Sequence, residues 1–224
     1  MTKVAVLIPA FNVRNHLAKL LQELTIRHPD MPVVVVDDGS SDGTYESIQN
    51  AFSKVTILRH QQNCGKGAAL KTGIAHICKH ISAEAVIFMD GDGQHPVDAL
   101  SGFIKLFKDT QATFIIGKRK FSASVMPLPR IASNTLTSKI VSLKIGTKVC
   151  DSQSGYRLIE RKLLEKLLPL TANRYNLETE ILIKAGKAGA IIKEIDIPTI
   201  YAHEKSNIRP ITDIVRFLRT YFTT

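Results

Sequence analysis

The chain has 224 residues, of which 44% are hydrophobic, and it carries a formal net charge of +10 at pH 7. A chain of this length buries one sizeable core, so we expect a single domain over residues 1–224. No apolar run approaches the roughly 20 residues that cross a bilayer, and no signal segment is evident, which predicts a cytoplasmic protein. The excess of positive charge indicates partners that carry phosphate, in nucleic acid, anionic lipid or small molecules.

In the first part of the chain, apolar runs typical of strands alternate with segments of helical period. Strands are predicted at residues 4–10, 33–38, 55–58, 85–90 and 112–119, and helices at 43–52, 65–80 and 97–108 and around Leu17, Leu20, Leu21 and Leu24. Continuous Val/Ile runs such as 33–36 are typical of strands that are buried on both faces of a parallel sheet. The pattern predicts a doubly wound α/β fold, with helices on both faces of a mostly parallel sheet.

The second part of the chain has a different character. Residues 120–130 contain two prolines and little periodicity, so we expect a mobile loop there. The elements predicted after it are a helix at 131–145, a strand at 154–160, a helix at 177–188 and a strand at 190–201. No linker or internal repeat divides the chain, so residues 1–119 and 120–224 are interpreted as two halves of one domain.

The last segment, PITDIVRFLRTYFTT, has the period of an amphipathic helix. Its apolar residues line one side, and Arg216 and Arg219 fall on the other. Two interpretations stay open. The helix packs on the core of the domain, or it lies on an anionic lipid surface with the help of Lys205 and Arg209.

The turn MDGDGQHP, residues 89–96, follows a predicted buried strand and carries the oxygen donors Asp90, Asp92 and Gln94. Asp37 and Asp38 end another strand, and parallel strands bring their carboxyl ends to one edge of the sheet. Two carboxylate clusters at one edge repel each other unless a cation lies between them. Oxygen donors suit Mg²⁺ or Mn²⁺, so a metal site is favoured over a solvated Asx turn. The three cysteines have no CxxC or Cys/His spacing, which predicts reduced thiols and argues against zinc.

Five motifs follow one another along the chain: IPAFN (8–12), VDDGSSDGT (36–44), NCGKGAALKTG (63–73), MDGDGQHP (89–96) and DSQSGYRLIE (151–160). In this order they resemble the inverting family 2 glycosyltransferases of GT-A fold, and within that family the polyprenyl (dolichyl) phosphate sugar transferases. Each motif alone is weak, but together they span nearly the whole chain. The resemblance implies a Rossmann-like, mostly parallel sheet, with nucleotide-sugar binding in residues 1–119 and acceptor binding in 120–224.

The resemblance also implies a metal site and a donor site. Asp90 and Asp92 would hold Mg²⁺ or Mn²⁺ against the donor diphosphate, with Gln94 as a third ligand, and the metal would neutralise the departing nucleoside diphosphate. His95 is left out of the metal set, because a His before Pro often caps a turn. The residues expected to bind the nucleotide sugar are Pro9, Phe11, Val36, Asp38, Lys66, Asp90, Gly91 and Asp92. The family usually carries a Glu at the ribose where this chain has Val13.

The glycine-rich motif NCGKGAALKTG lacks the terminal Lys-Ser/Thr and the glycine spacing of a Walker loop, which argues against a nucleotide kinase or GTPase. The resemblance implies that Gly65 and Gly67 pack tightly beneath the donor. Lys66 lies either near a donor phosphate or in solvent.

In polyprenyl phosphate sugar transferases, arginines at the positions of Arg119 and Arg130 face the donor and acceptor phosphates, and Asn134 joins them in the predicted acceptor-phosphate set. A guanidinium binds phosphate through a planar fork. A lipid phosphate is already ionised and needs no base, whereas a hydroxyl acceptor needs one, for which Asp151 is the candidate. Asp151 could instead hold Arg157 or cap a turn. The predicted catalytic residues are Asp90, Asp92, Arg119, Arg130 and Asp151.

Glu178 and Glu180 are candidates for orienting the acceptor region. They lie two residues apart on a predicted helix, so they cannot share one face. At least one of them is expected to be structural.

These inferences predict an inverting, metal-dependent glycosyltransferase that moves a sugar from a UDP- or GDP-linked donor to a polyprenyl phosphate. Contact with a membrane would be peripheral, on its inner face, or supplied by a membrane protein partner. One alternative is transfer to a hydroxyl of a glycan or another small acceptor. A second alternative, of a different class, is a basic nucleic-acid-binding module, but the resemblance argues against a nucleic-acid partner.

Overall fold

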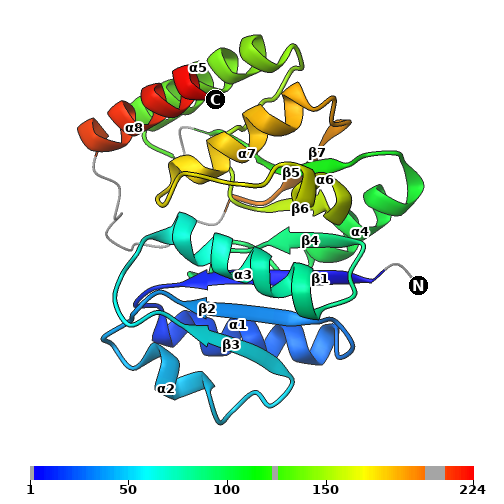
Figure 1. The fold of residues 1–224 in the computed structure, drawn as a ribbon, viewed down its shortest axis with the longest axis vertical. Helices are drawn as coiled ribbons and strands as arrows, with labels where there is room; N and C mark the ends of the chain where they lie inside the picture. The colour runs from blue at the N-terminus through cyan, green and yellow to red at the C-terminus, as the bar shows by residue number, and fades with distance from the viewer. Residues whose placement is uncertain (1–2, 123–125, 200–209) are drawn as a thin grey trace.

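A seven-stranded sheet forms the centre of the protein (Figure 1). The computed structural model describes residues 3–122, 126–199 and 210–224, except for the side chains of 210–214. The strands are β1 Val4–Ala10, β2 Val33–Asp37, β3 Val55–Arg59, β4 Ala85–Phe88, β5 Phe114–Arg119, β6 Arg157–Glu160 and β7 Ile192–Ile197. They lie in the order β3-β2-β1-β4-β6-β5-β7. The predicted α/β fold with a mostly parallel sheet is confirmed.

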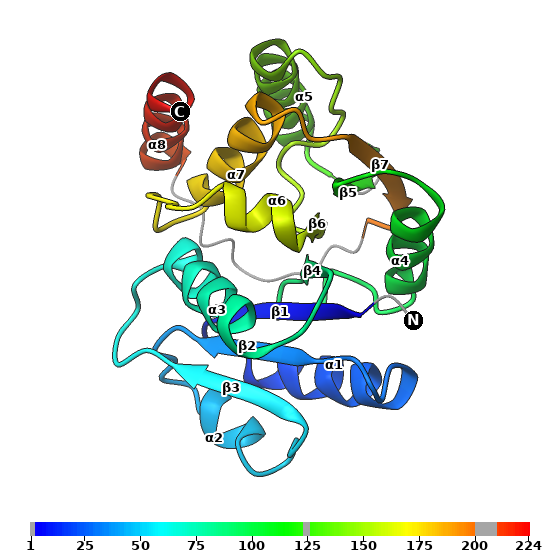
Figure 2. The same cartoon turned by 45° about the vertical axis from the view of Figure 1, so that its right-hand side comes forward.

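Helices cover both faces of this sheet (Figure 2). They are α1 Arg14–Arg27, α2 Thr44–Ile48, α3 Lys66–His80, α4 Ala99–Asp109, α5 Leu128–Ile145, α6 Arg161–Lys166, α7 Asn176–Lys187 and α8 Pro210–Thr223. Apolar side chains of α1, α2 and α4 belong to one buried cluster, and those of α3, α5, α6 and α7 belong to a second, against which α8 also packs. The two clusters are the cores on the two faces of the sheet.

Successive residues of the central strands alternate between the two cores. In β1, Val4, Val6 and Ile8 belong to the core beneath α1, whereas Ala5 and Leu7 belong to the core beneath α3. All of these side chains are buried. A strand that is covered on both faces has no side for polar residues, which explains why the sequence shows continuous apolar runs rather than alternation.

Strand β6 runs against both of its neighbours. It pairs antiparallel with β4 and β5, whereas the other pairings of the sheet are parallel. An antiparallel strand begins at the edge where its neighbours end. Residues 151–156, which lead into β6, therefore lie at the same edge as the turn after β4. Hydrophobic periodicity does not reveal strand direction, so the sequence did not predict this reversal.

In the second part of the chain, the start of one predicted helix was wrong and one helix was missed. α5 begins at Leu128 rather than at 131, because Pro129 lies in its first turn, where no backbone N–H is needed for the helix. α6 directly follows β6 and was missed, since six residues are too few to show a helical period. Residues 123–125 of the predicted loop, 200–201 of the last predicted strand, and Lys205 and Arg209 lie outside the described residues.

The C-terminal helix α8 has one side on the core and one side exposed. Phe217 and Tyr221 pack against the core beneath α7, whereas Val215, Leu218 and Phe222 are exposed. Among the described residues, no helix is both long and apolar enough to cross a bilayer. The packing of α8 on the core is thus confirmed, and lipid contact through its outer side stays a prediction.

Arg157 is a fully buried cation that joins β6 to the segments around it. Its Nε donates to the Ser154 carbonyl at 2.7 Å, its Nη2 to the Ser152 carbonyl at 2.7 Å, and its Nη1 to the Glu178 carbonyl at 2.5 Å. Burial lowers the pKa of Arg157. The guanidinium ties the loop before β6 to the first turn of α7, so its role is structural.

Replacing Arg157 by Leu should destabilise the protein strongly. The substitution leaves buried carbonyl groups without donors, which costs about 1–3 kcal/mol for each group that water cannot reach. Arg27→Leu is the matched control, because the Arg27 side chain is 50% exposed and its carboxylate partners return to water. Urea denaturation followed by circular dichroism compares the two variants. Equal losses of stability would contradict the structural role of Arg157.

Candidate functional site

Four of the predicted site residues lie at the carboxyl edge of the sheet. Asp38 follows β2, Asp90 follows β4, and Arg119 is the last residue of β5. Asp151 reaches the same edge because β6 runs in the opposite direction. Parallel strands deliver their carboxyl ends to one crevice, which is where open α/β sheets bind ligands.

Lys66 links the acidic turn after β4 to the second part of the chain. Its ammonium lies 2.7 Å from Oδ1 of Asp90 and 3.1 Å from Oε1 of Glu178. Burial alone would lower the pKa of Lys66, but the two carboxylates raise it above its usual range. Burial alone would raise the pKa of Asp90, but the Lys66 ammonium lowers it to about 2. Lys66 and Asp90 are therefore both charged at pH 7, and the Lys66 ammonium is held by carboxylate groups rather than by solvent.

The turn after β4 is folded by hydrogen bonds of its own. The backbone N–H of Asp90 donates to Nδ1 of His95 at 2.9 Å, and that of Gln94 donates to Oδ1 of Asp92 at 2.9 Å. His95 is buried, and its ring stacks on Tyr156 with 4.7 Å between centroids. Burial lowers the pKa of His95 to about 4, so the ring is neutral at pH 7. His95 thus caps the turn, as expected.

The donor atoms of this turn fit a hard divalent cation. Asp90 is ionised, and its side chain is partly exposed to solvent. Asp92 adds a second carboxylate, and Gln94 adds an amide oxygen. Mg²⁺ and Mn²⁺ prefer such oxygen ligands. The Lys66 ammonium already neutralises part of the negative charge at Asp90, so the Asp90 carboxylate can lie beside Glu178 before any divalent cation binds.

Asp38 is buried and bonded within the protein. Its Oδ1 accepts from the backbone N–H of Cys64 at 2.9 Å and lies 2.7 Å from Nδ1 of His60, and its Oδ2 accepts from the N–H of Gly65 at 2.7 Å. The side chains of Asp38, His60 and Cys64 offer possible metal ligands within 4.8 Å of one another, a grouping that the sequence spacing did not show. Nε2 of His60 lies 2.9 Å from Oγ1 of Thr72, so both ring nitrogens are engaged. Asp38 thus fixes the loop that leads into α3.

Gly65 and Gly67 allow this loop to approach the segment before α7. Gly65 has a φ of +103°, and a Cβ there would lie 2.4 Å from the Asn173 carbonyl oxygen. A Cβ on Gly67 would lie 2.6 Å from the Asn173 carbonyl carbon. Only glycine fits at such distances. Both glycines are tightly packed, as expected, and the contact is made by the second part of the chain.

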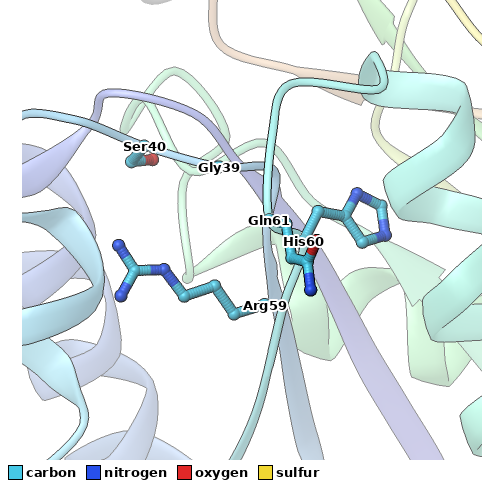
Figure 3. A pocket seen from close by; sticks show the side chains of 5 residues that line it. All are labelled: Gly39, Ser40, Arg59, His60 and Gln61. Atoms are coloured by element: carbon cyan, nitrogen blue, oxygen red, sulfur yellow. The ribbon is translucent and has the colours of Figure 1, made fainter.

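A hollow of about 350 Å³ opens beside Asp38, where β2 and β3 end. It is lined by Gly39, Ser40, Arg59, His60 and Gln61 (Figure 3). In Figure 3 the Arg59 and His60 side chains point away from each other. Nε of Arg59 lies 3.2 Å from Oδ2 of Asp37, which holds its guanidinium at one side of the hollow. The volume is in the range of small-ligand sites, about 300–1,000 Å³.

The other predicted nucleotide contacts differ in their accessibility. Phe11 is exposed just after β1, and Pro9 pairs with Val36 between β1 and β2. The Val36 side chain is fully buried in the core, so only its backbone remains for the predicted contact. Gly91 is buried beside Val13, whose Cγ2 would lie 3.3 Å from a Cβ at that position. The first part of the chain thus presents Phe11 and the hollow to a ligand.

Arg119 and Asp151 form a bidentate ion pair. Nε of Arg119 donates to Oδ2 of Asp151 at 2.7 Å, and Nη2 donates to Oδ1 at 2.9 Å. Asp151 is fully buried, and Arg119 is mostly buried. Burial alone would lower the pKa of Arg119, but Asp151 raises it. Both oxygens of Asp151 are used to orient Arg119, not Arg157.

The remaining acceptor residues lie on or beside α5 and α7. Arg130 and Asn134 are half-buried on α5, and Nδ2 of Asn134 lies 4.0 Å from Sδ of Met126. Glu180 accepts from the backbone of residues 171 and 172, which makes it the structural one of the two glutamates. Glu178 points to Lys66 instead, and sequence spacing could not decide between them.

Known proteins resemble this chain in sequence. The model of the family described as "Glycosyl transferase family 2" matches residues 5–168. The chain is 31% identical over 217 residues to a UDP-N-acetylglucosamine--dolichyl-phosphate N-acetylglucosaminyltransferase of Methanococcus voltae, covering 88% of this chain and 86% of that protein. It is 29% identical over 213 residues to a dolichyl-phosphate beta-glucosyltransferase of Trichomonas vaginalis, covering 87% of this chain and 64% of that protein.

Solved structures share the fold. The glucosyl-3-phosphoglycerate synthase of Mycobacterium tuberculosis, in complex with Mn²⁺, UDP and glucosyl-3-phosphoglycerate, matches with a TM-score of 0.76 and 19% identity. The match covers 99% of this chain and 79% of that one. A complex of the same enzyme with Mg²⁺ and UDP matches with a TM-score of 0.71 and 19% identity, covering 99% of this chain and 79% of that one. The expected GT-A fold is confirmed.

Removing the Lys66 ammonium should weaken the junction between α3, β4 and α7. Lys66→Met leaves Asp90 and Glu178 as like charges, and breaking such a pair costs about 3 kcal/mol when it is buried. The double variant Lys66→Met/Glu178→Gln should recover part of the lost stability, because the second substitution removes one of the two carboxylates. Lys71→Met, on the same helix but in an exposed contact with Asn173, is the control for urea denaturation. A Lys66→Met protein as stable as this control would disprove the role of the ion pairs.

Proposed function

This chain belongs to glycosyl transferase family 2, and we propose that it transfers a sugar from a UDP-linked donor to a polyprenyl phosphate, with inversion at the anomeric carbon. Nucleotide-sugar glycosyltransfer is the activity of the family. The observation that carries the choice of acceptor is the ion pair between Arg119 and Asp151, which occupies the candidate base.

The first part of the chain is the proposed donor site. The hollow beside Asp38 has room for part of a nucleotide, and the exposed ring of Phe11 offers a surface on which a base can stack. A UDP donor is supported by the name of the Methanococcus voltae relative and by the UDP complexes of the Mycobacterium tuberculosis enzyme. The acidic turn would then lie beside the diphosphate.

We assign a Mg²⁺ or Mn²⁺ site to Asp90, Asp92 and Gln94. When bound, such an ion stabilises the negative charge of the departing diphosphate. Lys66 keeps the Asp90 carboxylate in place, and His95 fixes the backbone of the turn. These contacts hold the ligand residues in position before the donor binds, which lowers the cost of organising the site. Mn²⁺ and Mg²⁺ in complexes of the Mycobacterium tuberculosis enzyme support the choice of ion.

The chemistry of Asp151 favours a phosphate acceptor over a hydroxyl. A general base needs a free carboxylate oxygen near the acceptor, but both oxygens of Asp151 accept from Arg119 within the protein. An acceptor phosphate brings its own ionised oxygen, so no base is required. The dolichyl-phosphate relatives support the same choice.

In the proposed reaction an oxygen of the polyprenyl phosphate attacks the anomeric carbon from the side opposite the UDP. The bond between that carbon and the diphosphate oxygen breaks, and UDP leaves with the bonding electron pair. No proton has to move. Two anionic reactants repel each other, so Arg119, oriented by Asp151, and Arg130 would serve as the cations that bind their phosphates.

Transfer to a hydroxyl is the second candidate within the family. It would require Asp151 to release Arg119 and accept a proton. A nucleic-acid-binding module is set aside, because the family membership makes the chain a glycosyltransferase. Since the proposed acceptor is a lipid, we place the enzyme peripherally on the inner face of a membrane, alone or with a membrane protein partner.

Removing divalent cations should weaken UDP binding. We expect the dissociation constant measured by calorimetry with Mn²⁺ to rise at least about tenfold after EDTA is added, a change of about 1.4 kcal/mol. Asp92→Ala should reproduce this loss in the presence of Mn²⁺. Asp109→Ala, which changes an exposed carboxylate at the end of α4, should bind like the wild type. If EDTA does not change the affinity of the wild type for UDP, Asp90, Asp92 and Gln94 do not have the assigned role in binding a metal.

The acceptor is tested by two substitutions with opposite expectations. Arg130→Lys keeps the charge but loses the planar fork, so it should impair transfer to polyprenyl phosphate far more than it impairs UDP binding. Asp151→Asn should lower the rate of transfer by less than the roughly 10²–10⁴-fold that loss of a general base causes. The pH profile of kcat/KM should keep its shape. Radiolabelled sugar transfer to polyprenyl phosphate measures both.

The exposed residue Arg27 provides the control for this pair of variants, because it lies on α1 and its Lys substitution should leave transfer unchanged. If Arg130→Lys transfers normally, or if wild type transfers to a hydroxyl acceptor and Asp151→Asn abolishes that transfer, the phosphate acceptor is the wrong choice.

A further inference from the structure

We propose that the outer sides of α5 and α8 form a docking surface for an anionic lipid membrane. This surface, called the α5–α8 face, consists of Leu128, Leu136, Leu143, Val215, Leu218 and Phe222 with the basic residues beside them. The proposal deepens the proposed function, because a membrane is where a polyprenyl phosphate is found. Binding to a membrane can nevertheless be measured without any transfer.

On α5, the apolar side chains that face outward form a stripe. Leu128, Leu136 and Leu143 are all exposed, and Leu143 is 83% exposed. Their spacings of eight and seven residues place them on one side of a helix. Ser138 and Val141 lie on the opposite, buried side. Among the described residues nothing covers this stripe, so it is an exposed apolar side of α5 rather than a set of scattered residues.

On α8, the outward side is also apolar. Val215, Leu218 and Phe222 are exposed at helical spacing, and Phe222 is 77% exposed. The two helices meet where Nζ of Lys144 on α5 donates to the Tyr221 carbonyl and lies 4.4 Å from the centre of the Tyr221 ring. Both helices lie at the end of the protein that is farthest from α1 and α2 (Figure 1). The two exposed apolar sides thus belong to helices that contact each other at one end of the protein.

The charges of this region are nearly all positive. α5 contains Arg130, Lys139 and Lys144 and has no Asp or Glu in its sequence. α8 contains Arg216 and Arg219, with Asp213 as its one acidic residue. Lys139 and Arg219 are exposed beside the apolar stripes.

Apolar residues flanked by cations match an anionic lipid surface. The apolar side chains enter the boundary between headgroups and acyl chains, while Lys and Arg attract the anionic headgroups. A second copy of the same chain would bring like charges together, which disfavours self-association through this face. An anionic membrane is the occupant that satisfies both the apolar and the charged residues.

The α5–α8 face also leads to the proposed acceptor site. Leu128 begins α5, and Arg130, proposed to bind the acceptor phosphate, lies in the same first turn. If the outer side of α5 rests on the membrane, the phosphate of a membrane-embedded acceptor lies at the level of the headgroups, close to that turn. Docking would thus bring the lipid phosphate to Arg130 without extracting the lipid chain.

Vesicle binding by the full chain tests the proposal. We expect the wild type to sediment with vesicles of phosphatidylcholine and phosphatidylglycerol, to sediment poorly with phosphatidylcholine alone, and to be released by salt. The variant Leu143→Glu/Phe222→Glu should bind at least about tenfold more weakly. The affinity of Lys139→Glu/Arg219→Glu for these vesicles should fall at least about fivefold for each cation removed. Ile26→Glu is the matched control, since Ile26 is 71% exposed on α1 at the other end of the protein.

Two further measurements separate lipid docking from misfolding and from self-association. Melting curves should show the variants folded, and Leu136→Glu/Leu143→Glu on α5 provides a second pair if the change at Phe222 disturbs α8. Equal vesicle binding by the wild type, the face variants and Ile26→Glu would overturn the proposal. It would also be overturned if the wild type dimerises in the ultracentrifuge, the face variants do not, and vesicles are not bound.

Transfer assays distinguish this proposal from the proposed function. A short-chain polyprenyl phosphate in detergent should be glycosylated equally by the wild type and Leu143→Glu/Phe222→Glu, whereas a long-chain acceptor in vesicles should be used poorly by the variant. Vesicle binding without transfer to either acceptor would reject the acceptor assignment and keep the docking surface. Equal transfer to both acceptors by this variant would reject the docking surface and keep the acceptor.

Discussion

The Lys66 ammonium holds the edge of the sheet together. It lies at the start of α3, while its partners Asp90 and Glu178 come from the turn after β4 and the first turn of α7. Two carboxylates that approach one point repel each other unless a cation lies between them, so the position of the acidic turn depends on this side chain. Gly65 allows the approach, since its positive φ and the contact with Asn173 leave no space for a side chain. The same residues thus set both the packing of the two parts of the chain and the position of the ionised Asp90.

Two arginines, Arg157 at the start of β6 and Arg119 at the end of β5, show how the surroundings decide the role of a cation. Arg157 donates to three backbone carbonyl groups and is fully buried, so it stabilises the fold. Arg119 has one side occupied by Asp151 and keeps part of its surface exposed at the edge. A buried cation whose donors are satisfied by the protein has little left for a ligand, whereas an oriented and partly exposed one is ready to bind an anion.

The polar side chains of the site are mostly positioned by the protein itself. Asp38 is held by the loop before α3, His95 by the turn that it caps, and Asp151 by Arg119. Groups fixed in this way need little reorganisation when charge develops on a substrate. This arrangement suits the proposed reaction between two anions, in which orientation and charge neutralisation would matter more than proton transfer. It also explains why a basic chain places carboxylates at its centre: each is paired with a cation or with N–H donors.

The sequence by itself determined which segments are strands, that both faces of the sheet are covered, and that Asp38 and Asp90 share one edge. These properties follow from local periodicity and from the ends of strands, and the five motifs indicated the family. Only the tertiary structure decided the direction of β6, the pairing of Asp151 with Arg119, the choice of Glu178 over Glu180 as the partner of Lys66, and the meeting of Asp38, His60 and Cys64. It also showed that apolar side chains on the outer sides of α5 and α8 are exposed. Each of these depends on contacts between residues far apart in the chain, and side-chain partners at such separations are set by packing rather than by sequence spacing.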